Sequence, residues 1–226
     1  MSIIETVLHQ MSSVSTPQRK FIIVLLTTLM CLRGKANYRN LSRYSKIHEK
    51  TYSRWFRREF DFVEFNRLSL GGLSTSSNSL VAAIDCSFTD KSGKHTHGLD
   101  IFYNSQHGRP EKGLEISSLA IVDVAYNTAY NFSTRQTPKL DNPDETRVDW
   151  YLHHLKEDRY ALPEGIRYLL TDGYYSKTKF VDGVVELDLH LIGKLRHDAD
   201  LRYLYRGPQK PRGCPRQYDG KVKLDV

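Results

Sequence analysis

The chain has 226 residues, of which 39% are hydrophobic and 26% charged, and its net charge at pH 7 is +7. This length allows one large domain or two small ones with a sizeable core, and the positive charge favours an anionic partner, nucleic acid first and an acidic membrane surface second. Three cysteines without a CxxC pair exclude a disulfide framework and a typical structural zinc site, as expected for a protein of the reducing cytoplasm. The most apolar run, residues 21–32, is well short of the roughly 20 residues that span a bilayer, and the N-terminus does not predict a signal peptide.

The first predicted helix is apolar. Pro17 follows Ser15 and Thr16, a pattern typical of a helix start. Residues 21–32 then predict a buried helix that ends near Gly34.

A polar and basic stretch follows at residues 37–60. Residues 38–44 and 49–60 predict two short helices joined by a turn at 45–48, which is the layout of a helix-turn-helix. The second helix has an aromatic stripe that would pack inward and cations beside it that would face a DNA major groove. We therefore expect four side chains to contact DNA: Lys50, Arg54, Arg57 and Arg58. The alternative is an ordinary amphipathic helix with a solvated basic face.

The glycine- and serine-rich residues 71–79 predict a linker. It separates a helical DNA-binding domain, residues 1–70, from a second domain, residues 80–226. In the second domain we predict strands at 80–88, 114–124, 125–135, 166–171 and 190–195, and helices at 143–160 and 176–187. Three early strands followed by helix–strand–helix–strand predict an α/β fold, an RNase H-like mixed sheet with flanking helices. A basic, proline-rich loop at 206–216 is expected to be exposed.

Two aspartates, Asp85 and Asp172, each follow an apolar strand segment. A carboxylate at the end of a buried strand is costly unless something compensates its charge. A divalent cation would compensate both if the two strands are neighbours, since Mg²⁺ takes carboxylate and phosphate oxygens as ligands. The alternative is a turn or cap residue after each strand. Three further acids near the early strands compete for the same role: Asp90, Asp100 and Asp123.

Several segments resemble bacterial insertion-sequence transposases with a DDE, RNase H-like nuclease domain. They are AIDCSFTDKSGKHTHGL (83–99), GLEISSLAIVDV (113–124), YLLTDGYYSKTKFV (168–181), LIGKLRHDADLRYL (191–204) and RGPQKPRGCPRQYDGKV (206–222). The resemblance implies that Asp85 and Asp172 are the first and second catalytic aspartates and bind Mg²⁺ or Mn²⁺. It also implies that Lys91 and Lys94 lie near the DNA backbone. The implied reaction is metal-dependent cleavage and strand transfer at the double-stranded ends of a transposon, without a covalent protein intermediate.

The same resemblance implies a third acid, a glutamate on a later helix within a Tyr-Arg-Glu-Lys signature, which this sequence does not contain. We therefore expect the nuclease domain to lack its C-terminal part. The leading hypothesis is an incomplete transposase that self-associates and sits in the bacterial cytoplasm, at the nucleoid through DNA, with no membrane partner. One alternative is a transposase-derived DNA-binding protein without catalytic activity, and another is a different RNase H-like nuclease.

Other chemistry-bearing residues have simpler interpretations. His95 and His97 with His107 could bind a metal, but a solvated loop is expected. Cys86 is expected to fill space in a strand rather than act as a nucleophile. We expect Glu186, and both His153 and His154, to lie on helix surfaces.

Overall fold

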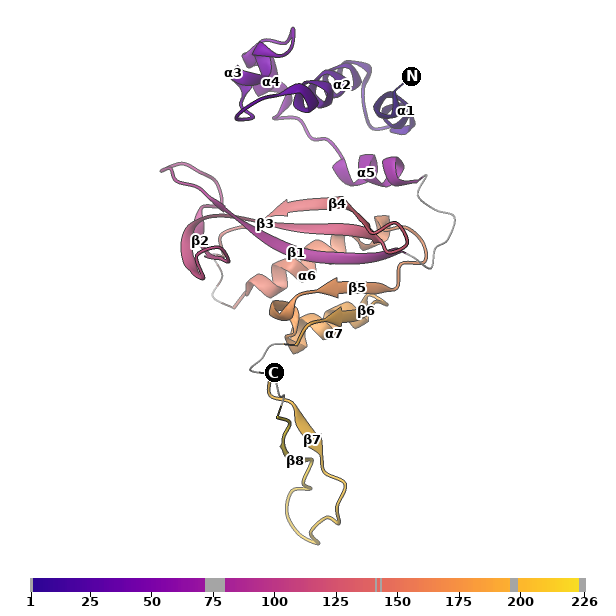
Figure 1. The fold of residues 1–226 in the computed structure, drawn as a ribbon, viewed down its shortest axis with the longest axis vertical. Coiled ribbons are helices and arrows are strands. Elements are labelled where there is room, and N and C mark those ends of the chain that lie inside the picture. Colours follow the sequence, from indigo (N-terminus) through magenta and orange to yellow (C-terminus); the bar gives the residue numbers. More distant parts are fainter. Residues whose placement is uncertain (1, 72–79, 141, 143, 196–198, 224–226) are drawn as a thin grey trace.

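The computed structural model describes residues 2–71, 80–140, 142, 144–195 and 199–223. A layer of helices stands at one end of the long axis, a sheet with helices against it lies in the middle, and a two-stranded hairpin extends from the other end (Figure 1). The predicted linker, residues 71–79, lies outside the described residues except for Gly71, which caps α5, so the division into domains 1–70 and 80–226 stays a prediction.

The helical layer contains five α-helices: α1 (Ile3–Gln10), α2 (Thr16–Cys31), α3 (Tyr38–Arg43), α4 (Glu49–Trp55) and α5 (Phe62–Leu70). Local sequence explains where several of them begin. Ser2 and Glu5 form a capping box at α1, Asn37 accepts from the backbone of α3, and Asp61 does the same for α5. The predicted helices at 21–32 and 38–44 are confirmed as α2 and α3.

The core of this layer forms around the apolar face of α2. Phe21 and Leu25 are buried there with Tyr52 of α4. The Phe21 ring stacks on Trp55 at a centroid distance of 5.1 Å and meets Tyr52 edge-on at 5.7 Å. The aromatic side chains of α4 therefore hold it against α2, as its sequence predicts, although Phe56 is 52% exposed.

The predicted length of the second basic helix, residues 49–60, is wrong. Helix α4 ends at Trp55, and the backbone N–H groups of Arg57 and Arg58 donate to the carbonyls of Arg54 and Trp55, three residues back. Such bonds tighten the last turn and end the helix. Two of the four predicted DNA contacts, Arg57 and Arg58, thus lie just beyond α4 rather than on it.

The second part of the chain is a mixed six-stranded sheet with helices, which confirms the α/β class. Its strands are β1 (Leu80–Asp90), β2 (Asp100–Asn104), β3 (Arg109–Asp123), β4 (Thr128–Gln136), β5 (Tyr168–Thr171) and β6 (His190–Gly193). The order is β2-β3-β1-β5-β6, and β4 also pairs with β3. Strands β1 to β4 pair antiparallel, whereas β5 pairs parallel with both β1 and β6. Strand β2 was not predicted.

Helices α6 (Arg147–Asp158) and α7 (Thr178–Glu186) pack against one face of this sheet. The core between these helices and the sheet contains Ala82 and Ile84 of β1, Leu169 of β5 and Leu155 of α6. Because side chains alternate along a strand, Ala83 and Asp85, which flank Ile84, point to the opposite face of the sheet. The fold therefore leaves Asp85 on the side of the sheet away from α6 and α7.

Beyond the sheet, β7 (Arg202–Leu204) and β8 (Tyr218–Lys221) form a separate antiparallel hairpin, which the sequence did not predict. The basic loop at 206–216 joins them and is exposed, as expected. In the part of the chain that the structure describes, no helix combines the length and apolar character needed to cross a membrane.

Candidate functional site

The parallel pairing of β1 with β5 brings Asp85 and Asp172 level with each other. Ala83 is the register partner of Leu170, and each aspartate lies two residues further along its own strand direction. Asp172 follows the last residue of β5 with an extended backbone, φ −80° and ψ −178°. Neighbouring strands lie about 4.8 Å apart, so the two carboxylates stand side by side, Asp85 in the middle of β1 and Asp172 just after the end of β5.

Each aspartate is fixed by one backbone hydrogen bond. Oδ1 of Asp85 accepts from the N–H of Cys86 at 2.8 Å, and Oδ1 of Asp172 accepts from the N–H of Tyr174 at 2.9 Å. Within the described residues neither Oδ2 accepts a hydrogen bond or meets a cation. One oxygen of each carboxylate therefore orients the side chain and the other is free to bind a ligand.

The electrostatics of the pair are unfavourable without a counter-charge. Desolvation raises the pKa of the Asp85 carboxyl, the Cys86 N–H opposes this rise, and the negative charge of Asp172 adds to it. Both side chains still reach solvent. A pair of level, mutually repelling carboxylates is the environment that a divalent cation relieves.

A polar groove of about 840 Å³ starts at Asp85 and follows the outer half of β1 to the turn between β2 and β3. His107 and Lys112 line its far end, and Asp172 is not among its lining residues. Glu111, also in the groove, accepts hydrogen bonds from His107 at 2.8 Å, Asn104 at 2.7 Å and Arg109 at 2.7 Å, which lower its carboxyl pKa to about 2. Its oxygens are thus occupied, in contrast to those of Asp85.

Behind β1, on the core side, a cluster of hydroxyl groups supports the strand that carries Asp85. The Cys86 sulfur lies 3.1 Å from the hydroxyl of Tyr175, and Tyr151 donates to the buried Glu115 at 2.6 Å. Burial raises the pKa of the Cys86 thiol to about 11. A thiol that stays protonated at neutral pH is a poor nucleophile, which agrees with the space-filling role predicted for Cys86.

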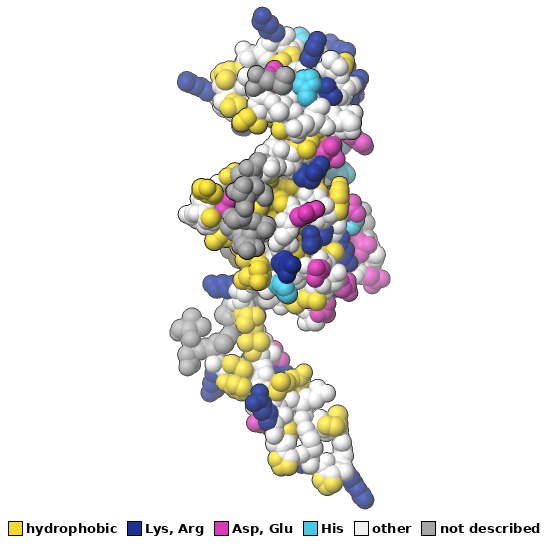
Figure 2. All heavy atoms as spheres, turned by 90° about the vertical axis from the view of Figure 1, so that its right-hand side faces the viewer, with side chains coloured by type: hydrophobic (Ala, Val, Ile, Leu, Met, Phe, Trp, Pro, Cys, Tyr) yellow, Lys and Arg dark blue, Asp and Glu magenta, His cyan; other side chains and the backbone are white. Residues whose placement is uncertain are grey.

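The basic residues of the helical layer form an exposed surface. All nine Lys and Arg side chains between positions 33 and 58 are exposed: Arg33, Lys35, Arg39, Arg43, Lys46, Lys50, Arg54, Arg57 and Arg58. Exposed rings of Tyr38, Tyr44 and Phe56 lie among them. Lysine and arginine also gather at this end of the molecule in Figure 2. Lys91 and Lys94 are exposed too, in the loop after β1.

Asp123 and the three histidines do not join the aspartate pair. The Asp123 side chain is buried and accepts from the N–H groups of Ala125 and Tyr126, so it shapes the turn between β3 and β4. His95 and His97 are exposed in a different loop from His107. No group of three or more His, Cys, Asp or Glu side chains suited to a metal occurs in the described residues. Glu186 is exposed, as predicted.

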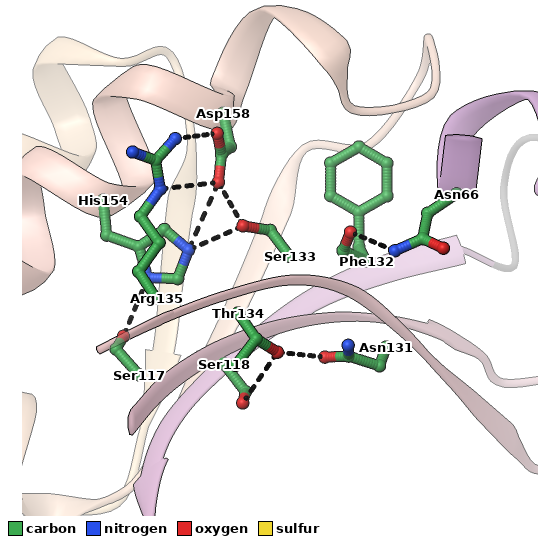
Figure 3. A network of polar contacts seen from close by, with 10 residues as sticks. All are labelled: Asn66, Ser117, Ser118, Asn131, Phe132, Ser133, Thr134, Arg135, His154 and Asp158. Atoms are coloured by element: carbon green, nitrogen blue, oxygen red, sulfur yellow. Dashed lines mark hydrogen bonds and ion pairs between the residues drawn. The ribbon is translucent and has the colours of Figure 1, made fainter. Parts of the chain in front are cut away.

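The prediction for His154 is wrong, because this histidine is 0% exposed whereas its neighbour His153 faces solvent. Figure 3 shows the network that holds it. His154 contacts the hydroxyls of Ser117 and Ser133, each at 2.9 Å, and Asp158 at 3.2 Å; Arg135 completes the network through an ion pair with Asp158. One pattern in the sequence could have indicated this buried network: His154 and Asp158 are four residues apart and therefore share one face of the helix.

No protein-family model matches this chain, and no curated protein matches it at a significant level.

Proposed function

We propose that this chain is a DNA-binding protein with a two-carboxylate, Mg²⁺-dependent phosphoryl-transfer site of the kind found in DDE transposases. The observation that carries the proposal is the level placement of Asp85 and Asp172 on neighbouring parallel strands, with their Oδ2 atoms free. The element order of the sheet domain, early antiparallel strands and then α6, β5, α7 and β6, supports an RNase H-like interpretation of the fold.

The residues present fit a hard divalent cation. Asp85 and Asp172 would hold Mg²⁺ or Mn²⁺, since both offer a carboxylate oxygen without a partner among the described residues and a bound cation would offset their repulsion. When bound, such an ion supplies charge neutralisation at a phosphate and activation of a water or a 3′-hydroxyl. The chain itself positions the two carboxylates, through the Cys86 and Tyr174 N–H groups.

The substrate class follows from the basic surface of the helical layer. Helices α3 and α4, joined by a short turn, would act as a helix-turn-helix, and Lys50 and Arg54 of α4 are exposed. A single acid, Glu49, lies among the nine cations, at 3.9 Å from Arg39. This surface is suited to the phosphate backbone of double-stranded DNA.

A second candidate function is DNA binding without catalysis. It is favoured by one observation: in residues that the structure describes, no third carboxylate joins Asp85 and Asp172. Two ligands would hold a metal more weakly than three. The two functions share the DNA interface and differ only in whether a strand is cut.

A nicking experiment separates them. We expect the full chain to convert supercoiled plasmid to nicked circles in Mg²⁺ or Mn²⁺, and Asp85→Asn or Asp172→Asn to lower this rate about 100-fold or more, because metal coordination contributes several kcal/mol to such reactions. Glu186→Gln, at an exposed acid away from the pair, is the matched control. DNA binding without nicking would support the second function, and nicking that survives in both aspartate variants would refute the proposed site.

A further inference from the structure

The hairpin at the far end of the molecule is strongly basic and is not used by the function proposed above. We call residues 199–223 the arm. It contains seven Lys and Arg residues and two acids. The cations are Arg202, Arg206, Lys210, Arg212, Arg216, Lys221 and Lys223.

The arm has no core of its own, because none of its residues is buried. Both of its acids are neutralised within it: Asp200 pairs with Arg202 at 2.8 Å, and Asp219 with Arg216 at 2.6 Å. By contrast, Arg206, Lys210 and Arg212 form no ion pair with any residue that the structure describes. A concentration of positive charge without internal compensation remains at the tip of the arm.

The loop that carries these three cations has a defined shape. Gln209 closes the loop through two hydrogen bonds with the backbone of Arg216. Its side chain donates to the Arg216 carbonyl at 2.7 Å and accepts from the Arg216 N–H at 2.8 Å. The Arg216 guanidinium lies over the ring of Tyr205 at 4.6 Å, and the Tyr205 hydroxyl donates to the carbonyl of Pro208. Three prolines restrict the backbone further. The tip therefore presents its cations from an ordered loop.

The chemistry of the tip points to phosphate groups rather than to an apolar protein partner. Residues 206–216 contain only Arg, Lys, Gly, Pro, Gln and Cys, so they offer no large apolar side chain for a protein interface. Arginine forks and lysine ammonium groups bind phosphate oxygens well. A two-stranded β-ribbon also has the width that a DNA major groove admits.

We propose that the arm is a second DNA-binding element, which contacts the phosphate backbone through Arg206, Lys210 and Arg212. The arm and the basic helical layer lie at opposite ends of the long axis, with the sheet between them (Figure 1). One duplex, or one duplex end and its flank, would thus be held on both sides of the aspartate pair. The identity of the partner as DNA rests on the proposed function.

The test measures the affinity of the full chain for a DNA duplex over a range of salt concentrations. The arm variant is Arg206→Ala/Lys210→Ala/Arg212→Ala. We expect it to bind about tenfold more weakly and to reduce the slope of log K against log salt by about 2 to 3, since each lost phosphate contact removes roughly 0.9 from that slope. The control, Lys139→Ala/Lys156→Ala/Arg167→Ala, removes the same net charge from exposed positions of the sheet domain.

Two further measurements distinguish a failure of the arm proposal from a failure of the proposed helical interface. Lys50→Ala/Arg54→Ala tests the helical interface: if it leaves affinity unchanged while the arm variant weakens it, the α4 assignment fails and the arm proposal stands. An arm variant that matches the control in affinity and slope overturns the arm proposal alone. Loss of binding to phosphatidylserine vesicles with unchanged DNA binding would also overturn it, in favour of a membrane surface. Thermal unfolding checks that all variants are folded.

Discussion

Asp85 differs from the other perturbed carboxylates of this chain in having no cationic or side-chain donor. Glu111, Asp149 and Asp158 each have such donors, and their pKa values are lowered to about 2. Desolvation and the negative charge of Asp172 raise the pKa of the Asp85 carboxyl, and a single backbone donor, the Cys86 N–H, opposes them. At neutral pH the fold therefore carries an electrostatic cost at Asp85 that a bound cation would remove.

This cost gives a prediction for stability. A carboxyl whose folded pKa is raised contributes stability while it is protonated, and loses that contribution as pH rises through the folded pKa. At pH 7 Asp85→Asn should therefore raise the melting temperature in EDTA by about 1–3 °C. Mg²⁺ should raise the melting temperature of the wild type and leave that of Asp85→Asn unchanged, as differential scanning fluorimetry would measure.

The control is Asp90→Asn, because Asp90 is exposed at the end of the same strand. It should respond to Mg²⁺ as the wild type does. An equal Mg²⁺-induced rise in Asp85→Asn and the wild type would show that the cation binds elsewhere.

Asp158 illustrates the opposite case. Burial alone would raise the pKa of its carboxyl, but hydrogen bonds from His154, Arg135 and Ser133, with the charge of Arg135, outweigh burial and lower the pKa to about 2. Asp158→Asn removes the charge but leaves the partners buried, so we expect a loss of about 3 kcal/mol in the free energy of unfolding at pH 7. Urea denaturation measures this loss.

The pH dependence of that loss has a definite sign. Because the folded pKa of Asp158 is depressed, its contribution is fully present above about pH 4, the ordinary value for an aspartate, and fades as pH falls toward 2. The difference in the free energy of unfolding between the wild type and Asp158→Asn should shrink as the pH falls from about 4 toward 2. Glu157→Gln, at an exposed position next to Asp158, should show no such difference. A difference that is constant from pH 6 to pH 3 would mean that the Asp158 charge is not its source.

At the scale of elements, the sequence predicted best where one pattern dominates. The apolar run of α2 and the apolar strand β1 were both found, because each buries one continuous face. Helix α5 was missed, since its apolar residues divide between two cores and leave no single stripe. Strand β2 was missed because only Phe102 and Asn104 of its five residues are buried.

The two aspartates of the site were predictable one by one but not as a pair. In the sequence an apolar strand segment runs into an aspartate at both Asp85 and Asp172, although β1 continues beyond Asp85 to Asp90. Their adjacency depends on β1 pairing with β5, which is separated from it by three strands and a helix. The network around His154 was not foreseen for the same reason: its hydroxyl partners Ser117 and Ser133 come from β3 and β4, and only the three-dimensional pairing brings them to α6.

Across the whole molecule, α5 connects the helical layer to the sheet. Phe65 and Leu68 pack against the core of the helical layer, whereas Val63 packs against the core of the sheet domain. Asn66 donates to the backbone carbonyl of Phe132 in β4 at 2.9 Å. Since one short helix contributes to both cores, we expect the two parts to unfold together, and the basic surface of the helical layer to be held in a fixed position relative to the aspartate pair.

The two tryptophans allow this coupling to be measured, because Trp55 reports on the helical layer and Trp150 on the sheet domain. Each of the variants Trp150→Phe and Trp55→Phe keeps a single tryptophan. In each variant we expect the urea midpoint from tryptophan fluorescence to equal the midpoint from far-UV circular dichroism, which follows the whole chain. Adding Val63→Ala/Asn66→Ala should separate the two transitions, because the loss of two methyl groups and of the hydrogen bond to the Phe132 carbonyl weakens the junction by about 2 kcal/mol. Arg67→Ala, on the exposed side of α5, should keep them coincident. Separate transitions in the chains without the junction substitutions would contradict the coupling, and the helical layer would then be an independently folding unit.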